Sequence, residues 1–278
     1  MLKREWIPLT NEINGAIKTN PISFLTWNTL ARQLASSGFS NCDNIENIIS
    51  WDHRKNKIIN VLLEHNYDII CLQEVDEYAN FFQPIMDKLG YDSLFCAKFN
   101  QFSDGICIFW KRDKFRAIDG TNLRYLNHSQ VCLIVVLEVI QDKQRFCVGT
   151  THLKAKNGFE KERLEQATIF MNNLKEMSNK YECPIMLAGD MNDDPNSIAI
   201  AEYKKSYTSV YNENNCEWTT WKKRKDVIRK VIDYIFHDSN IVPISILRIP
   251  LDKECPLLLP AEYHPSDHMS IGCQFILK

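Results

Sequence analysis

The sequence predicts an α/β protein in which two mixed β-sheets pack against each other and helices cover their outer faces. Eight short apolar segments have the length and composition of buried strands, which is too many for one small sheet. Three further segments carry apolar residues at helical spacing. Hairpin-like strand pairs alternate with strand–helix–strand units along the chain, and this order is typical of mixed sheets with helices outside.

The predicted elements follow from local patterns. Each strand is an apolar run bounded by turn-forming residues, and the eight are Ser23–Asn28, Tyr67–Glu74, Asp104–Lys111, Val131–Ile140, Arg145–Lys154, Pro184–Asn192, Val231–Asp238 and His268–Leu277. The predicted helices are Trp51–Asn66, Tyr78–Gly90 and Phe159–Tyr181. In the last helix Leu164, Ala167, Met171 and Leu174 form one apolar face. Because no repeat or Gly/Pro/Ser-rich linker divides the chain, we expect one domain over residues 21–278 after an N-terminal tail of residues 1–20.

Composition limits the function. Thirty-three basic and thirty-five acidic residues give a net charge of -2, so phosphate groups must be bound by a local patch of cations rather than by a global positive field. No two of the ten cysteines are closer than eleven residues (Cys96 and Cys107), which excludes CxxC zinc or redox pairs. Free thiols, the lack of a signal-like N-terminus and the lack of a membrane-spanning apolar run predict a cytoplasmic protein without membrane contact.

Polar residues abut the apolar strand cores at several points. They are Asn28, Glu74, His152, Asp190, Asn192, Asp233 and the pair Asp267-His268. One acid or amide at a strand end is usually a turn former, but a whole series of them suggests a shared site. Carboxylate and amide oxygens with little imidazole and no thiolate suit Mg²⁺ and disfavour Zn²⁺. A histidine beside an aspartate, with a second aspartate to orient it, suits hydrolysis of a phosphate ester.

An ordered series of motifs makes the sequence recognisable. "WN" after a strand, "LQE", "THL", "GDMN", "IDYIF" and "SDH", spread over about 240 residues, resemble the motif series of the endonuclease/exonuclease/phosphatase superfamily. The resemblance implies a four-layer α/β/β/α sandwich with the site at one edge of the two sheets. The segments "LTWNTLARQLA", "THLKAKNGFEKERLEQ" and "TTWKKR" are similar to the nocturnin branch of the deadenylase-related group.

This resemblance implies a Mg²⁺-dependent enzyme, with Mn²⁺ as a possible substitute. Glu74 is expected to be the direct metal ligand with Asn28 beside it, and Asp267 is expected to complete the acidic cluster on the metal side.

The catalytic roles implied by the resemblance fall on five residues. Asp190 and Asn192 would bind or orient the attacking water and the phosphate. His268 would act as general base or electrostatic partner, oriented by Asp233, and His152 would donate to a non-bridging phosphate oxygen.

Two substrates are consistent with this branch: the 2′-phosphate of NADP(H) and the 3′ end of poly(A) RNA. Lys98, Lys154, Lys156 and Arg224 match positions that hold the phosphates of the dinucleotide, with Lys156 in place of an arginine. An exonuclease is expected to have a long basic track with stacking platforms. A few local cations on a net acidic chain therefore favour NADP(H), and no obligate protein partner is implied.

The sequence differs from the usual pattern of this group at two places, and some of its features also have an interpretation other than catalysis. Met191 stands where this group usually has phenylalanine, and a flexible methionine can fill the same space. The segment Lys98–Asp104 is shorter than the corresponding loop of the nocturnin branch.

Two alternatives to a functional interpretation remain. The basic run Trp221–Lys230 would by default be a solvated loop. A catalytically inactive RNA- or protein-binding scaffold is a third possibility, against which all the metal-side and catalytic positions carry suitable residue types.

Overall fold

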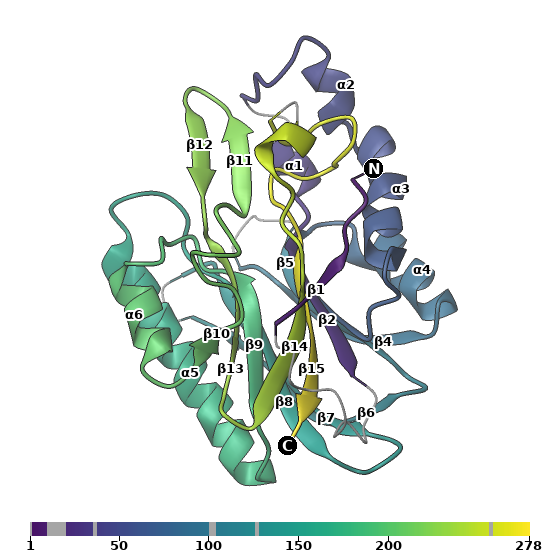
Figure 1. The fold of residues 1–278 in the computed structure, drawn as a ribbon, viewed down its shortest axis with the longest axis vertical. Coiled ribbons are helices and arrows are strands. Elements are labelled where there is room, and N and C mark those ends of the chain that lie inside the picture. Colours follow the sequence, from purple (N-terminus) through teal and green to yellow (C-terminus); the bar gives the residue numbers. More distant parts are fainter. Residues whose placement is uncertain (1, 10–20, 36–37, 100–103, 126–127, 256–257) are drawn as a thin grey trace.

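The chain forms a four-layer α/β/β/α sandwich, as the sequence predicts (Figure 1). The computed structural model describes residues 2–9, 21–35, 38–99, 104–125, 128–255 and 258–278. Sheet A consists, in spatial order, of β1 (Trp6–Pro8), β14 (Ile241–Leu247), β15 (Ile271–Leu277), β2 (Ile22–Asn28), β3 (Ile69–Val75), β5 (Gly105–Lys111) and β4 (Tyr91–Ala97). Sheet B consists of β10 (Thr208–Ser209), β13 (Asp233–His237), β9 (Ile185–Asp190), β8 (Arg145–His152), β7 (Val131–Val139) and β6 (Phe115–Arg124).

Helices cover the outer face of each sheet. Sheet A is covered by α3 (Trp51–Leu63), the π-helical turn η1 (Tyr78–Phe82) and α4 (Gln83–Lys88), and sheet B by α5 (Glu160–Tyr181) and α6 (Ile198–Lys204). The remaining elements are α1 (Arg32–Ala35), α2 (Ile45–Ile49), the hairpin of β11 (Thr220–Lys223) and β12 (Val227–Lys230), and the short 3₁₀ helix η2 (Asp252–Glu254). The hairpin, α1 and α2 lie together at one end of the sandwich (Figure 1).

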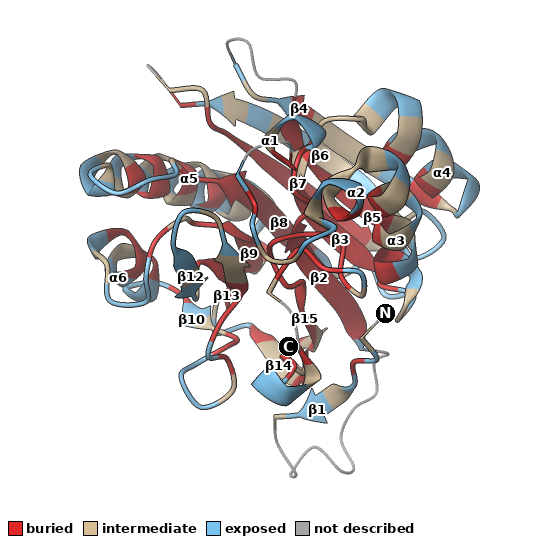
Figure 2. Ribbon diagram, turned by 90° about the horizontal axis from the view of Figure 1, so that it is seen from above, coloured by how far each residue is buried: buried red, intermediate tan, exposed pale blue. Residues whose placement is uncertain are grey.

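Three apolar cores correspond to the three interfaces between layers. The central core joins the inner faces of both sheets and includes Phe24, Ile108, Leu133 and Ile235. The two outer cores join sheet B to α5 and α6 and sheet A to α3 and α4. Burial follows this layering, with buried residues along the sheets and exposed residues on the outer helices (Figure 2). Every residue of β2 is buried, and β7 is apolar except for Glu138, because both faces of these strands are covered.

All eight predicted strands are present, with ends displaced by at most three residues. The three predicted helices are also present, although the second begins as a π-helical turn. The stretch expected as a tail contributes to sheet A: β1 pairs with β14, and the buried Arg4 donates hydrogen bonds to Leu247 O, Arg248 O and Ser270 O. Residues 10–20 of that stretch lie outside the described residues.

The strand directions bring several strand ends to one edge of the sandwich. β2 and β3 are parallel neighbours in sheet A, and β8 and β9 are parallel neighbours in sheet B. In sheet B His152 stands opposite Asp190, and the antiparallel β13 places Asp233 on the other side of Asp190. The predicted polar strand ends therefore meet above the central core.

All ten cysteines are free and nine of them are buried, including Cys71, Cys107, Cys132, Cys147 and Cys273 in the predicted apolar runs. Burial raises the pKa of most of these thiols, for example that of Cys132 to about 12, so they behave as core residues. Among the described residues, no helix is long and apolar enough to span a membrane.

Candidate functional site

Asp190, the last residue of β9, is the centre of the polar cluster. Its Oδ2 accepts a hydrogen bond from Asn28 Nδ2 at 2.9 Å, which links it to sheet A. The same oxygen lies 3.5 Å from His152 Nε2 and 3.8 Å from His268 Nε2. Asp190 Oδ1 accepts a hydrogen bond from the backbone N–H of Asn192 at 2.9 Å. The structure thus brings four of the predicted site residues around the buried carboxylate of a fifth, Asp190.

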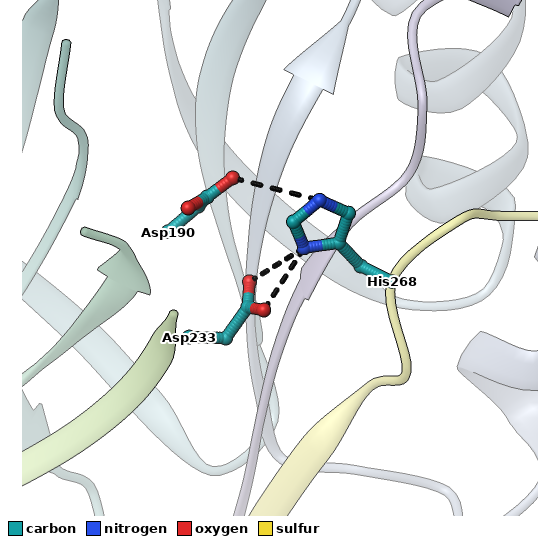
Figure 3. A group of neighbouring side chains, drawn as sticks. All are labelled: Asp190, Asp233 and His268. Carbon is teal, nitrogen blue, oxygen red and sulfur yellow. Dashed lines mark hydrogen bonds and ion pairs between the residues drawn. The ribbon is translucent and has the colours of Figure 1, made fainter. Parts of the chain in front are cut away.

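His268 is held on its other side by Asp233. Its Nδ1 lies 2.9 and 3.2 Å from the two carboxylate oxygens of Asp233, so the ring is fixed between two aspartates (Figure 3). The backbone of His268 is fixed as well: Trp27 Nε1 donates to its carbonyl at 2.7 Å, and its N–H donates to Ser266 Oγ at 3.1 Å. The same Ser266 hydroxyl donates to Asn28 O at 2.6 Å, which joins the loop before β15 to the end of β2.

Burial and neighbouring charge set the protonation of this cluster. Burial alone would lower the pKa of His268, but Asp233, Asp190 and Asp267 raise it to about 9. Burial and the Asp233 carboxylate raise the pKa of Asp190 to about 7. Burial and the Lys98 cation hold the pKa of His152 well below its usual value. The cluster therefore combines an imidazolium ion with a neutral imidazole across one shared aspartate.

Glu74 is presented to the cluster by a break in the strand ladder. The pairing of β3 with β5 shifts between Gln73 and Val75, so Glu74 occupies a bulge with a left-handed backbone (φ 56°). A glutamate in this conformation is strained, and such strain is common where a bulge redirects a side chain into a site. Glu74 Oε1 accepts from Asn28 Nδ2 at 2.9 Å, and Oε2 accepts from the backbone N–H of Ala31 at 3.0 Å.

Asp267 forms a buried ion pair that the sequence analysis did not include. Its Oδ2 lies 2.5 Å from Lys222 Nζ, while Oδ1 is buried and has no hydrogen-bond partner among the described residues. Burial would raise the pKa of Asp267, but the Lys222 ammonium and the His268 imidazolium hold it well below its usual value. Lys222 lies on β11, where Thr220 donates to Asp267 O at 2.8 Å. The "TTWKKR" motif contains this lysine, but sequence alone did not show which of its two lysines turns inward.

Known proteins match the chain over nearly its whole length. The sequence pattern of the Endonuclease/Exonuclease/phosphatase family matches residues 25–268. The chain belongs to this family. Mouse Nocturnin is 30% identical over 98% of this chain and 69% of its own length. The solved catalytic domain of human Nocturnin, with a bound sulfate anion, has a TM-score of 0.80 at 27% identity and covers 99% of this chain and 98% of that one. A probable CCR4-Not complex 3′-5′-exoribonuclease subunit Ccr4 of Vairimorpha ceranae is 28% identical over 83% of this chain and 59% of its own length.

These matches confirm the family and the nocturnin-like branch expected from the sequence motifs. Members of the endonuclease/exonuclease/phosphatase family are hydrolases that act on ester bonds, and they typically depend on a divalent metal ion. The chain is therefore an ester-bond hydrolase of this family.

The residues at the cluster fit a hard divalent cation. The carboxylates of Asp267, Glu74 and Asp190 all lie close enough to Lys222 to raise its pKa, and Asp267 Oδ1, without a hydrogen-bond partner among the described residues, is a spare buried acceptor. Asp190, Asp233 and His268 also offer one ligand atom each, all within 4.8 Å of one another. In this arrangement Asn28 directs its Nδ2 toward Glu74 and Asp190, while its Oδ1 accepts from Leu30 N at 3.0 Å.

The predicted substrate-binding cation Lys98 lies at the rim of the cluster. Its side chain is only 8% exposed, and its ammonium lies 2.6 Å from Oδ2 of Asp104, a fully buried carboxylate that was not among the predicted site residues. Lys98 is close enough to His152 to lower the pKa of that histidine.

The other three predicted cations stand on two loops around the cluster. Lys154 Nζ lies 4.7 Å from the centroid of the Phe159 ring, and the Arg224 guanidinium lies 4.2 Å from that of Phe39. Lys156 is exposed and has a left-handed backbone (φ 80°). Lys154 and Arg224 therefore combine charge with an aromatic neighbour, while Lys156 is directed to solvent.

Proposed function

We propose that the chain is a Mg²⁺-dependent phosphoesterase that hydrolyses the 2′-phosphate of NADP(H) at the strand-end cluster. The observation that carries the proposal is the convergence of Asn28, His152 and His268 on one carboxylate oxygen of Asp190, with Glu74 on the other side of Asn28. Acidic oxygens, a hydrogen-bonded imidazolium and a second imidazole within a few ångströms are the groups that phosphate ester hydrolysis needs.

Glu74 would hold the Mg²⁺, with Asn28 beside it and Asp267 completing the metal side, and Mn²⁺ could take the same place. The bound cation would supply positive charge that polarises the phosphoryl group. The Lys222 ammonium lowers the net negative charge of this side by pairing with Asp267.

The other residues would act on water and phosphate. Asp190 and Asn192 would orient the attacking water, and an Asp190 carboxylate with a pKa near 7 is suited to accept its proton. His268, held as an imidazolium by Asp233, would face a phosphoryl oxygen through Nε2. His152 would donate from Nε2 to a non-bridging oxygen as negative charge develops there.

The choice of NADP(H) rests on how the cations are distributed. Lys98, Lys154, Lys156 and Arg224 come from three separate segments of the chain, and the net charge of the chain is -2. Such a set suits the few phosphates of a compact dinucleotide, whereas a chain of nucleotides calls for a continuous basic track. Recognition of poly(A) is the second candidate, because one relative of this chain is named as a 3′-5′-exoribonuclease.

One assay distinguishes hydrolysis of NADP(H) from shortening of poly(A) RNA. Purified protein with Mg²⁺ is offered NADPH and an RNA with a 3′ A-tail, and inorganic phosphate release is measured beside RNA length. We expect phosphate from NADPH. Stepwise shortening of the tail without phosphate release from NADPH would make the exoribonuclease the correct function.

We also propose a domain boundary and a cellular compartment for the enzyme. We place one catalytic domain over residues 21–278, with β1 as an added edge strand of sheet A. Ten free cysteines support a reducing compartment such as the cytoplasm.

A further inference from the structure

Two buried arginines connect the outer helices to the loops of the candidate site. Arg54 lies on α3, which covers sheet A, and is fully buried. Arg163 lies on α5, which covers sheet B, and is 3% exposed. Neither is among the strand-end residues, and burying an arginine is costly unless its donors are used. Their hydrogen bonds therefore show what each one stabilises.

Arg54 binds two loops, one that directly follows Asn28 and one that contains Asp267. Its Nη1 donates to Thr29 O at 3.0 Å and to Pro265 O at 3.1 Å, and its Nε donates to Ile49 O at 3.0 Å. Thr29 directly follows Asn28, and Pro265 precedes the Ser266-Asp267-His268 segment. Nη2 is buried and has no hydrogen-bond partner among the described residues. The nearby carboxylates of Asp267, Asp76 and Glu74 stabilise the charge without forming a close ion pair with it.

Arg163 binds the loops on the opposite side of the cluster. Its Nη1 donates to Lys154 O at 3.1 Å and to Lys156 O at 2.8 Å, which fixes the turn that presents both lysines. Its Nε forms an ion pair with Asp193 Oδ2 at 3.0 Å, and Asp193 directly follows Asn192. Arg163 thus holds the loop after β8 against the loop after β9.

We propose that Arg54 and Arg163 are positioning residues with separate tasks, Arg54 for the metal side of the site and Arg163 for the loop that presents the substrate-binding lysines. The inference rests on the proposed function. The planar guanidinium fork can bond two carbonyls from different loops at once, whereas a lysine keeps the charge but presents one compact ammonium group. Replacing either arginine by lysine should therefore let the two loops that it joins move apart.

The test compares Arg54→Lys with Arg163→Lys through three measurements. They are kcat and KM for phosphate release from NADPH, binding of Mn²⁺ to the substrate-free protein by electron paramagnetic resonance, and the melting temperature. Arg54→Lys should lower kcat and weaken Mn²⁺ binding by about 10- to 100-fold each, the usual range for groups that support metal ligands. Arg163→Lys should raise KM by about tenfold, while Mn²⁺ binding changes by less than about twofold.

Arg4→Lys is the matched control, because Arg4 is also buried and also donates to several backbone carbonyls, but it joins the segment before β1 to the end of β14 and to Ser270, just before β15. It should lower the melting temperature and leave Mn²⁺ affinity and KM unchanged. Arg54→Gln, which keeps a planar two-donor amide, is measured in parallel in case the lysine variant does not fold. Equal changes of kcat, KM and Mn²⁺ affinity in both arginine variants, or changes no larger than in Arg4→Lys, would overturn the proposal. If the wild-type protein releases no phosphate from NADPH, the proposed function is wrong, but the Mn²⁺ measurement still decides whether Arg54 acts on the metal side.

Discussion

The hydrogen-bonded pair of His268 and Asp233 allows a quantitative prediction. A rise in the pKa of His268 from 6.5 to about 9 corresponds to about 3 kcal/mol of stabilisation of the imidazolium. Asp233 is the leading cause of this rise and lies 2.9 and 3.2 Å from Nδ1, so we assign it about 2 kcal/mol. Asp233→Asn should then lower kcat about thirtyfold or more, because His268 loses both charge and orientation.

A double-mutant cycle measures the coupling. Asp233→Asn, His268→Asn and the double variant are assayed for phosphate release from NADPH at saturating Mg²⁺. Since Asp233 acts through His268, the double variant should be about as slow as His268→Asn alone, which gives an interaction of about 2 kcal/mol. Asp119→Asn is the control for loss of a carboxylate, because Asp119 on β6 accepts hydrogen bonds from Lys180 and Tyr181 of α5. Additive losses in the logarithm of kcat would refute the coupling.

The same pair should be visible in the pH dependence of stability. Because folding raises the pKa of His268, the stabilisation is fully present below pH 6.5 and is lost as the pH rises through about 9. Asp233→Asn should reduce this loss. The free energy of unfolding in urea, measured with the metal-free protein at several pH values between 6 and 9.5, tests the expected difference between the two proteins.

Three other substitutions have specific expected results. Glu74→Gln should lower kcat by about two orders of magnitude or more without changing the melting temperature. Excess EDTA should lower the kcat of the wild-type enzyme to a similar extent. Near-normal turnover in either case would contradict a metal held by Glu74. Arg224→Ala should raise KM for NADPH about tenfold with little change in kcat, which steady-state kinetics will show. Gly189→Ala should destabilise the fold by about 3 kcal/mol or more in urea unfolding, because Gly189 has φ +151° and a Cβ there would lie 2.0 Å from Thr151 O of the neighbouring strand. An unchanged unfolding midpoint would contradict this.

The central strands could be predicted from sequence because both of their faces are buried. β7 and β9 are almost uninterrupted apolar runs, so their ends are easy to locate in the sequence. The strands that were missed lie mostly at the edges or outside the two large sheets. In β6 exposed and half-buried residues dominate. The hairpin of β11 and β12, including its turn, consists mainly of charged residues. An edge strand is specified by pairing with its neighbour more than by its own composition.

Helix α5 shows a subtler limit of the sequence pattern. The predicted apolar face included Leu164 and Met171, but both are only partly buried, and Arg163 and Phe170 are buried instead. The spacing identified the helix correctly. Arg163 is not recognisable as a core residue from the helical pattern, because an arginine is rarely buried without partners and its partners come from the loops after β8 and β9.

The cations around the site could be located in the sequence, but the charge that they offer to a substrate depends on contacts made by the fold. Lys98 shares its ammonium with the buried Asp104, so a phosphate would have to compete with a carboxylate 2.6 Å away. Lys154 lies against the Phe159 ring, and its ammonium forms no ion pair with a carboxylate of the described residues. We therefore expect the loop after β8 to be the stronger anchor for a phosphate of the substrate, and we expect Arg163, which bonds Lys154 O and Lys156 O, to set the position of that anchor relative to Asp190. If so, Lys154→Ala should raise KM for NADPH more than Lys98→Ala does in the same assay, and the reverse order would show that Asp104 does not screen Lys98.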